Sequence, residues 1–382
     1  MEQASHAAQC ALYIQYQARL PPRSPRFYWP DDLYLLAAQS TLDTILFDGS
    51  ENDSCEEYDR AFLKHLIKRL EHAVEGCTEE NAKSLGFKLE DIAIDDALLF
   101  RYMALISLPE ECSFVGAKTP HVLTTRHYFP VPTRNKHKLL GSAESIVLRE
   151  DGAAISQGTT GLKTWEASLR LGAYLVQEQD ALFTKNVRIL EVGSGAGFLG
   201  VLCARLLQAR HTPDASLCLT DLEGIVLDRL RETALRSKYI KIHSNADHLP
   251  SLRIHSVDWN EVACRETPSY DVLFRERANL ILAADVVYDP NLIGALVETI
   301  YSALGREHHT NNEPRHALVA STVRNPDTYA KFLEALATKQ LVWRPINVKQ
   351  VSWPGIPHLP IFPSVHDAIA EGSVVILDIQ SP

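Results

Sequence analysis

The chain has 382 residues, of which 46% are hydrophobic and 23% charged, and it carries a formal net charge of −10. This composition is ordinary for a folded globular protein with one large domain or two smaller ones. The acidic balance excludes a general basic field that would hold a nucleic-acid backbone, so we expect no direct nucleic-acid partner.

The cysteines give no sign of a disulfide framework or a zinc site, because their number, seven, is odd and none has CxxC spacing. We therefore expect no metal. No uncharged stretch reaches the roughly 18 to 20 residues that cross a bilayer, and the N-terminal stretch does not have the pattern of a signal peptide. The expectation is a cytoplasmic protein with no membrane partner, and nothing points away from a monomer.

Residues 1–140 are expected to form a helical N-terminal domain. The segment 56–74 places Phe62, Leu66 and Leu70 on one helical face and Lys64 and Lys68 on the other. "DDLYLLAAQSTLDTILF" and "EDIAIDDALLFRYMALISL" have similar patterns, with acidic residues in their first turns. The pattern predicts a small helical bundle packed against the main domain, and a role in docking a protein substrate is compatible with that packing. The run 116–138, rich in proline and basic residues, is predicted to be a linker to a second domain, residues 141–382.

The second domain is predicted to be α/β. A β-hairpin is expected around Asp151-Gly152, followed by a helix over 162–177. Short apolar runs such as "VRILEVG", "ASLCLTD" and "NLILAADVVYD" then alternate with helical segments. This alternation predicts right-handed crossovers and a mostly parallel, Rossmann-like sheet of seven strands with helices on both faces. The last two strands, 344–353 and 373–380, have no clear helix between them, so an antiparallel pair is expected at the sheet edge.

The loop "EVGSGAGFLG" (191–200) lies where the first strand of this sheet meets its helix. Gly193 and Gly195 can take positive φ angles and let a ligand approach the backbone. Two patterns fit the loop. Gly195, Gly197 and Gly200 match the dinucleotide pattern G-x-G-x-x-G. Glu191 with the first three glycines matches the acidic-x-G-x-G-x-G pattern of S-adenosylmethionine enzymes. A tight turn with no ligand remains a third interpretation.

Residues at the ends of the neighbouring strands favour S-adenosylmethionine. Glu191 can meet the cationic methionine part of the cofactor, and Asp221 can accept hydrogen bonds from both ribose hydroxyls. A dinucleotide enzyme would use Asp221 in the same way, so this residue does not choose the cofactor. Asp258 and Trp259 can contact adenine by hydrogen bonding and stacking, although a tryptophan at a strand end is otherwise a core or rim residue.

The fourth strand ends in "AADVVYDP", which holds Asp285 and Tyr288 at D-x-x-Y spacing. These two residues are the candidate catalytic pair. A carboxylate can orient a lysine ammonium while a phenol ring packs against it. Transfer needs the neutral amine, and Asp285 can help to accept the proton. The alternative is that Asp285 only caps the helix that follows Pro290.

With these residues described, "EVGSGAGFLG", "LTD", "VDW" and "AADVVYDP", in that order, resemble the seven-β-strand protein methyltransferases that modify lysines on non-histone proteins. "GTTGLKTWEASLRLGAYL" and "ASTVRNPDTYAKFLEAL" narrow the resemblance to the elongation factor 2 lysine methyltransferases. The resemblance covers essentially the whole chain, including the helical N-terminal region.

This resemblance implies S-adenosylmethionine-dependent methylation, repeated to the trimethyl state, of a lysine on translation elongation factor 2. It also implies roles for particular residues in binding the methyl donor. These residues are Trp165, Gly193, Ser194, Gly195, Asp221, Trp259 and Ala284.

Three alternatives stay open. The first is a methyltransferase of the same fold that acts on another protein lysine or on a small molecule. The second is an NAD(P)-dependent oxidoreductase, although no Tyr-x-x-x-Lys relay is evident. The third is a binding module without chemistry, which the intact Asp285 and Tyr288 disfavour.

Overall fold

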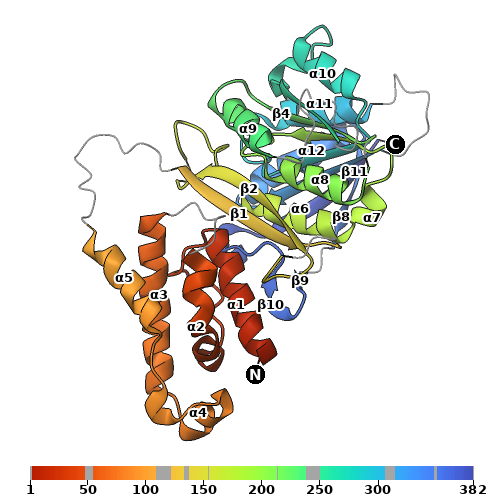
Figure 1. Cartoon of the computed structure of the whole chain (residues 1–382). Helices are drawn as coiled ribbons and strands as arrows, with labels where there is room; N and C mark the ends of the chain where they lie inside the picture. The colour runs from red at the N-terminus through yellow and green to blue at the C-terminus, as the bar shows by residue number, and fades with distance from the viewer. Residues whose placement is uncertain are drawn as a thin grey trace. The chain divides into compact units, whose positions relative to one another are not determined.

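The computed structural model describes residues 2–47, 55–108, 122–132, 137–153, 155–212, 214–237, 250–305, 315–347 and 351–381. The chain divides into two compact units (Figure 1). The first comprises residues 1–130, 134–143 and 352–365, and the second comprises residues 131–133, 144–351 and 366–382. None of the helices in the described ranges combines the length and the apolar character that crossing a bilayer requires.

The first unit is mainly helical. Its helices are α1 (Glu2–Gln17), α2 (Asp32–Phe47), α3 (Glu56–Glu75), α4 (Glu79–Leu85), the 3₁₀ turn η1 (Leu89–Asp91) and α5 (Asp96–Ser107). Helices α1, α2 and α3 lie side by side (Figure 1). The amphipathic pattern predicted for α3 is confirmed, since Phe62, Leu66 and Leu70 are buried while Lys64 and Lys68 are exposed.

The predicted linker is wrong over β1 (Val122–Pro130), which is a strand. Its β-branched residues, followed by aromatic ones, suit a strand, and no proline lies in the strand before its last residue, Pro130. Tyr128 and Phe129 are buried, and the Tyr128 hydroxyl lies 2.9 Å from the Tyr13 hydroxyl. A short hairpin of β9 (Ser352–Trp353) and β10 (Ile356–Pro360) completes this unit.

The hairpin expected at Asp151-Gly152 is only half formed. Strand β2 (Ala143–Asp151) is present, but the residues after it that the structure describes form turns and a single bridge between Ser156 and Thr159. The side chain of Asp151 is the physical reason. It is buried, pairs with Arg229 at 3.1 Å and accepts a 2.5 Å hydrogen bond from the Ser156 hydroxyl. The chain is therefore drawn away from a two-residue turn.

The second unit is built on a seven-stranded sheet, as predicted. Its strands are β3 (Arg188–Val192), β4 (Ser216–Asp221), β5 (Ser251–Ser256), β6 (Leu280–Ala284), β7 (His316–Thr322), β8 (Val342–Ile346) and β11 (Val374–Gln380). The order is β5-β4-β3-β6-β7-β11-β8. The first five are parallel, and β11 runs antiparallel to both β7 and β8. The edge strand β8 contains Pro345, which cannot donate to a sheet ladder.

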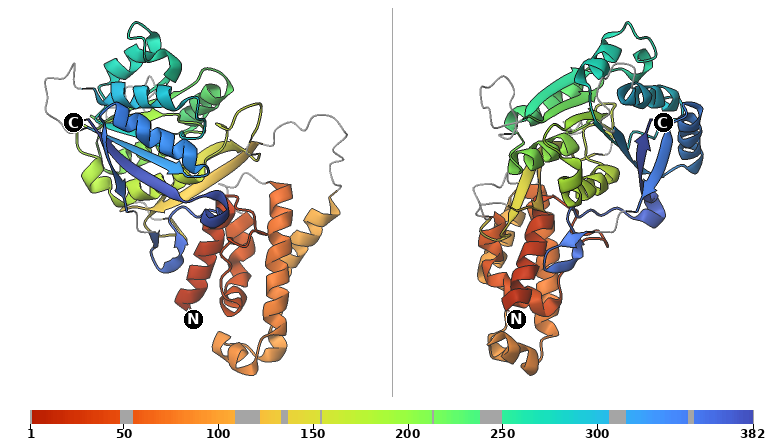
Figure 2. Two further views of the ribbon diagram at one scale, coloured as in Figure 1. Left: turned by 180° about the vertical axis from the view of Figure 1, so that it is seen from behind. Right: turned by 90° about the vertical axis from the view of Figure 1, so that its right-hand side faces the viewer.

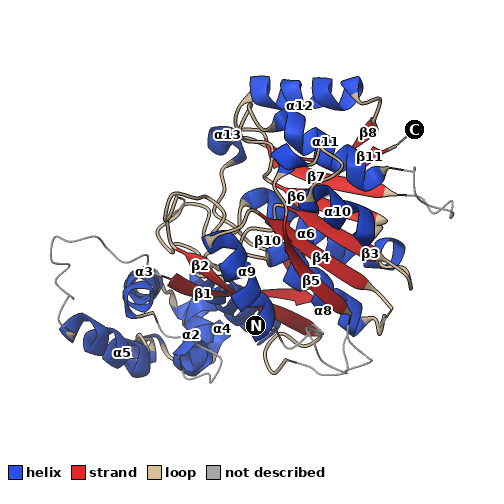
Figure 3. Ribbon diagram, turned by 90° about the horizontal axis from the view of Figure 1, so that it is seen from above, coloured by secondary structure: helices blue, strands red, loops and turns tan. Residues whose placement is uncertain are grey.

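Helices cover both faces of this sheet (Figures 2 and 3). One face carries α6 (Glu166–Gln177), α8 (Phe198–Ala209) and α9 (Ile225–Arg236). The other carries the 3₁₀ turn η2 (Trp259–Glu261), α10 (Pro268–Glu276), α11 (Ile293–Leu304) and α12 (Pro326–Thr338). The short helices α7 (Gln179–Leu182) and α13 (Ala368–Glu371) lie in connections. The strand order reverses direction at β3, which creates a crevice beyond the carboxyl ends of β3 and its neighbours.

A buried ion pair lies within the helices of the first unit. The Asp59 carboxylate accepts a hydrogen bond from the Tyr16 hydroxyl at 2.6 Å and pairs with Arg19 at 3.3 Å. Both charged side chains are almost fully buried. Burial raises the pKa of Asp59, and the bonds from Tyr16 and Arg19 offset part of this rise.

Removing one partner of such a pair leaves a buried charge without compensation. We therefore expect Asp59→Ala to lower the free energy of unfolding by about 3–5 kcal/mol. Glu90→Gln, which breaks the exposed pair of Glu90 with Lys88, is the matched control and should change stability little. Urea unfolding followed by circular dichroism measures both variants. Equal, small effects would mean that the buried pair does not stabilise this unit.

Candidate active site

A cavity of about 400 Å³ opens at the carboxyl ends of the central strands. All eleven site residues predicted from the sequence line it. They are Trp165, Glu191, Gly193, Ser194, Gly195, Asp221, Asp258, Trp259, Ala284, Asp285 and Tyr288. The structure therefore brings together residues that span more than a hundred positions of the sequence.

The glycine loop lines the cavity with residues that have no side chain. Gly193 has φ 71° and Gly195 has φ 52°, so the positive φ angles predicted for both residues are confirmed. A Cβ atom at Gly193 would lie 2.8 Å from Cγ1 of Val286 and 3.4 Å from Cζ2 of Trp259. A Cβ atom at Gly195 would lie 3.1 Å from the carbonyl oxygen of Gly161. Only glycine fits these positions without strain or displacement of a neighbour.

Asp221, at the end of β4, fixes this loop. Its Oδ2 accepts a 2.8 Å hydrogen bond from the Gly195 N–H, and its Oδ1 accepts one of 2.8 Å from the Leu222 N–H. Burial raises the pKa of Asp221, and these two backbone bonds offset part of the rise. Each carboxylate oxygen has a second lone pair, so hydroxyl donors of a ligand can still bind there.

Glu191 is a buried acid of the cavity with a strongly raised pKa. Only 3% of it is exposed, and its Oε2 atom is buried without a hydrogen-bond partner. Burial raises its pKa from 4.5 to about 8, and the charge of Asp221 adds to the effect. Buried polar atoms are usually satisfied, so this oxygen indicates a place for a donor group of a ligand.

The adenine-side candidates lie next to the glycine loop. Asp258 accepts a 2.9 Å hydrogen bond from the Asn260 N–H and so caps η2, which carries Trp259. The benzene edge of the Trp259 indole faces Gly193 at near-contact distance. This tryptophan is half-buried, so part of its ring remains available to a planar ligand group.

Asp285 ties three elements together. Its Oδ1 accepts a 2.8 Å hydrogen bond from the Thr322 N–H, and its Oδ2 accepts bonds from the Thr322 hydroxyl (3.1 Å) and from the Ala167 N–H in the first turn of α6 (3.2 Å). Arg324 pairs with Oδ1 at 3.5 Å, and only 5% of the Asp285 side chain is exposed. The residue also has φ 53°, a strained value for a non-glycine residue.

Tyr288 differs from Asp285, because it is 55% exposed. Partial burial raises the pKa of its phenol, and the charges of Asp221 and Asp289 add to this. The phenol therefore stays neutral near pH 7 and offers a hydrogen-bonding group and a ring face at the cavity.

Sequence reasoning missed the surroundings of Trp165. Its indole N–H donates a 2.9 Å hydrogen bond to the Thr160 carbonyl, and the Arg324 guanidinium lies 5.1 Å from the ring centroid. Thr160 and Gly161 line the cavity from the loop that precedes α6. The "GTTG" turn was a sequence signal for that loop, but no local pattern marked Arg324.

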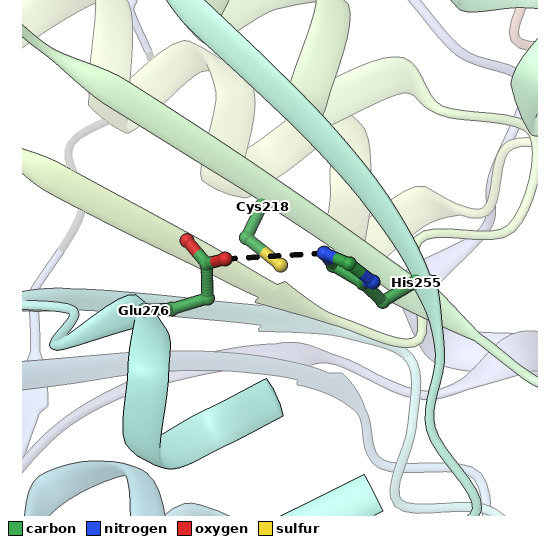
Figure 4. A group of neighbouring side chains, drawn as sticks. All are labelled: Cys218, His255 and Glu276. Atoms are coloured by element: carbon green, nitrogen blue, oxygen red, sulfur yellow. Dashed lines mark ion pairs between the residues drawn. The ribbon is translucent and has the colours of Figure 1, made fainter. Parts of the chain in front are cut away.

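A second cluster lies outside the cavity lining. Cys218, His255 and Glu276 place their possible ligand atoms within 4.8 Å of one another (Figure 4). Glu276 lies 3.9 Å from the His255 ring and accepts two bonds from Arg253, of 2.7 and 2.5 Å. The charge of this carboxylate is thus already matched by the Arg253 guanidinium, so the cluster is accounted for without a metal ion.

Comparison with known proteins yields one family and several relatives. A family model described as lysine methyltransferase matches residues 144–339, just over half of the chain. The human protein-lysine N-methyltransferase EEF2KMT is 34% identical over 209 residues, which cover 54% of this chain and 58% of the human protein. The mouse EEF2KMT is 30% identical over 210 residues, with the same shares of the two chains.

The protein-lysine N-methyltransferase EFM3 of Chaetomium thermophilum is 28% identical over 333 residues, covering 82% of this chain and 87% of that protein. The alignment with the human and mouse proteins thus spans under two thirds of their length, whereas the fungal alignment extends over most of both chains.

The raised pKa of Glu191 makes stability depend on pH. Between pH 4.5 and about 8 the folded chain keeps a proton that the unfolded chain has released, so the free energy of unfolding falls as pH rises through this window. We expect Glu191→Gln to remove this dependence, leaving stability near pH 4.5 similar and raising it at pH 8, by about 1.4 kcal/mol per unit of pKa shift. Thermal unfolding at both pH values measures it, with Glu334→Gln on the exposed face of α12 as control. Parallel pH profiles in wild type and Glu191→Gln would contradict the prediction.

The close approach at Gly193 can be tested by substitution. Gly193→Ala combines an unfavourable φ with contact against Val286 and Trp259, and Gly193→Arg adds bulk that fills the cavity. We expect affinity for S-adenosylmethionine to fall about tenfold or more in both variants. Gly355→Ala is the matched control, since Gly355 also has positive φ but a Cβ atom there meets nothing within 4 Å. Tryptophan fluorescence titration reports affinity, and unchanged binding in Gly193→Arg would sink the assignment of this loop.

Proposed function

The chain belongs to the lysine methyltransferase family, and on this premise we propose that it transfers the methyl group of S-adenosylmethionine to the ε-amine of a protein lysine. The observation that carries the proposal is that the positive-φ glycines Gly193 and Gly195 line the cavity. They lie beside the Asp221 carboxylate, in the same cavity as the exposed Tyr288. The proposed nucleoside site and the proposed amine site would share this one cavity.

The residues present fit the cofactor. Asp221 would hold the ribose hydroxyls, Trp259 with Asp258 the adenine, and the glycine backbone the part between adenosine and methionine. The unpartnered oxygen of Glu191 would accept a hydrogen bond from the amino group of the methionine portion. When bound, S-adenosylmethionine supplies an electrophilic methyl group.

On the acceptor side, the chain must deliver a neutral amine, because lysine's ordinary pKa is about 10.4 and only the lone pair forms the new bond. The bound S-adenosylmethionine would supply the methyl carbon to this lone pair, and the electron pair of the broken carbon–sulfur bond would stay on its sulfur. The ammonium formed by the first or second transfer would release a proton to solvent before the next transfer, whereas the trimethylammonium formed by a third transfer has no proton to release and keeps its charge. Tyr288, which lines the cavity, would pack its ring against the alkyl stem.

We assign Asp285 a positioning role, which differs from the catalytic role that its D-x-x-Y motif suggests. Its carboxylate is almost fully buried, and both of its oxygen atoms already accept hydrogen bonds. These contacts favour a positioning role, in which Asp285 holds the start of α6, with Trp165, against the ends of β6 and β7.

We extend the proposal to translation elongation factor 2 as the substrate, to repeated transfer up to trimethyl-lysine, and to the cytoplasm as the place of action. The sequence resemblance and the name EEF2KMT of the human relative support this choice of substrate. Residues 1–140 would dock the protein substrate, and residues 141–382 would carry the methyltransferase site, with the chain acting as a monomer.

The test is mass spectrometry of elongation factor 2 after incubation with the purified chain and S-adenosylmethionine. One lysine is expected to gain one to three methyl groups. Methylation of a different protein in a lysate, with elongation factor 2 untouched, would keep the chemistry and replace the substrate. If no lysine gained a methyl group, the proposal would fail.

Variants of Tyr288 test the acceptor side. Tyr288→Ala should lower kcat/KM for the protein substrate roughly tenfold, because the lysine stem loses its ring contact. Tyr288→Phe keeps the ring and should retain most of the activity. Cofactor affinity should change less than kcat/KM in both, since more than half of Tyr288 is exposed. Equal losses in Ala and Phe would point to the hydroxyl instead of the ring.

A further inference from the structure

Arg324 follows β7 and is the cationic side chain that pairs with Asp285 in the described structure. Its guanidinium lies 3.5 Å from Asp285 Oδ1 and 5.1 Å from the centroid of the Trp165 ring. It thus bridges a residue at the end of β6 and a residue at the start of α6. The proposed mechanism gives this arginine no role, although about 40% of its side chain is exposed.

The backbone beneath Arg324 is held in place. The Arg324 N–H donates to the Thr322 carbonyl at 2.9 Å, and the Val323 N–H donates to the Ser373 carbonyl at 2.9 Å. A Cβ atom at Gly372 would lie 2.3 Å from the Val323 carbonyl oxygen, so the two segments are packed without a gap. The arginine therefore projects from a fixed point and not from a free loop.

The acidic groups that line the cavity accept hydrogen bonds, pair with an arginine or are neutral. Glu191 has a pKa raised to about 8 and is largely protonated near pH 7. Asp221 accepts two backbone N–H groups, and Glu166 at the start of α6 pairs with Arg170 at 2.6 Å. The remaining titratable groups on elements that border the cavity are Lys163, Glu223, Asp258, Tyr288 and Asp289.

We infer that Arg324 is a positioning residue that occupies the counter-ion place at Asp285, so that the acceptor lysine enters as a neutral amine and not as an ammonium paired with this carboxylate. The inference rests on the proposed function. Arg324 and a lysine ammonium would compete for the same Asp285 carboxylate. With Arg324 in place, the Asp285 charge is compensated and cannot stabilise a second cation. Without Arg324, a lysine ammonium could take its place and be held in the unreactive form.

The test is the pH dependence of kcat, which reports ionisations in the enzyme–substrate complex. In Arg324→Gln the uncompensated Asp285 favours the ammonium, which raises the pKa of the bound lysine. The rising limb of the profile should therefore move to higher pH by roughly one to three units, the effect of an opposite charge within a few ångströms. Arg324→Lys keeps the cation and should leave the limb in place. Arg324→Gln combined with Asp285→Asn removes both charges and should move the limb back.

Two controls distinguish a shift of the pH profile caused by the lysine pKa from a general loss of structure. Arg344→Gln breaks another Arg–Asp pair of the second unit, with Asp378 on β11, and should leave the profile unmoved. Thermal unfolding and cofactor titration confirm that each variant is folded and binds S-adenosylmethionine. A rate loss in Arg324→Gln that is uniform across pH, with the limb in its wild-type position, would overturn the inference. An inactive wild-type chain would instead overturn the proposed function on which the inference rests.

Discussion

The carboxylate of Asp285 connects the elements that form one wall of the cavity, and the geometry of the cavity depends on these contacts. Three hydrogen bonds and one ion pair connect it to Ala167, Thr322 and Arg324, so one side chain holds the end of β6, the end of β7 and the start of α6. Its left-handed backbone turns the chain sharply after the strand. The surrounding contacts must compensate for that strain, which is a common property of functional sites.

A second constraint concerns the negative charge of the acidic residues that line the cavity. The chain is acidic overall, and five acidic residues line this chamber. In four of them the negative charge is removed by a proton or stabilised by a neighbouring group. Glu191 is buried enough to hold a proton, Asp221 accepts backbone N–H groups, Asp258 caps η2, and Asp285 is paired with arginine. The chamber is therefore rich in acceptors but poor in uncompensated negative charge. This combination suits the site that we propose, which would bind a sulfonium cofactor and a neutral amine.

The sequence was informative where function depends on short, contiguous patterns. Positive φ at Gly193 and Gly195 follows from the spacing of the loop, and strand–helix alternation was sufficient for the order of the main elements. The residues that end successive parallel strands gathered at one edge of the sheet, because that edge is where such ends meet.

The sequence did not predict contacts between residues that lie far apart in the chain. The Asp285 carboxylate meets residues 37 and 118 positions away, and Asp59 meets Arg19 across 40 positions. No periodicity encodes such pairs. Strand β1 was hidden by the prolines around it, and the turn at Asp151 was overridden by the buried bond to Arg229. In both cases tertiary contacts outweighed a local signal.

Strand β8 has a consequence of its own. It ends the sheet, and an open sheet edge is a template on which another chain can add a strand. Pro345 removes one N–H from this edge and stiffens the backbone beside it. A strand from another molecule would find an interrupted row of donors there, so the fold carries its own protection against edge-to-edge aggregation while the chain is crowded by its neighbours in the cell.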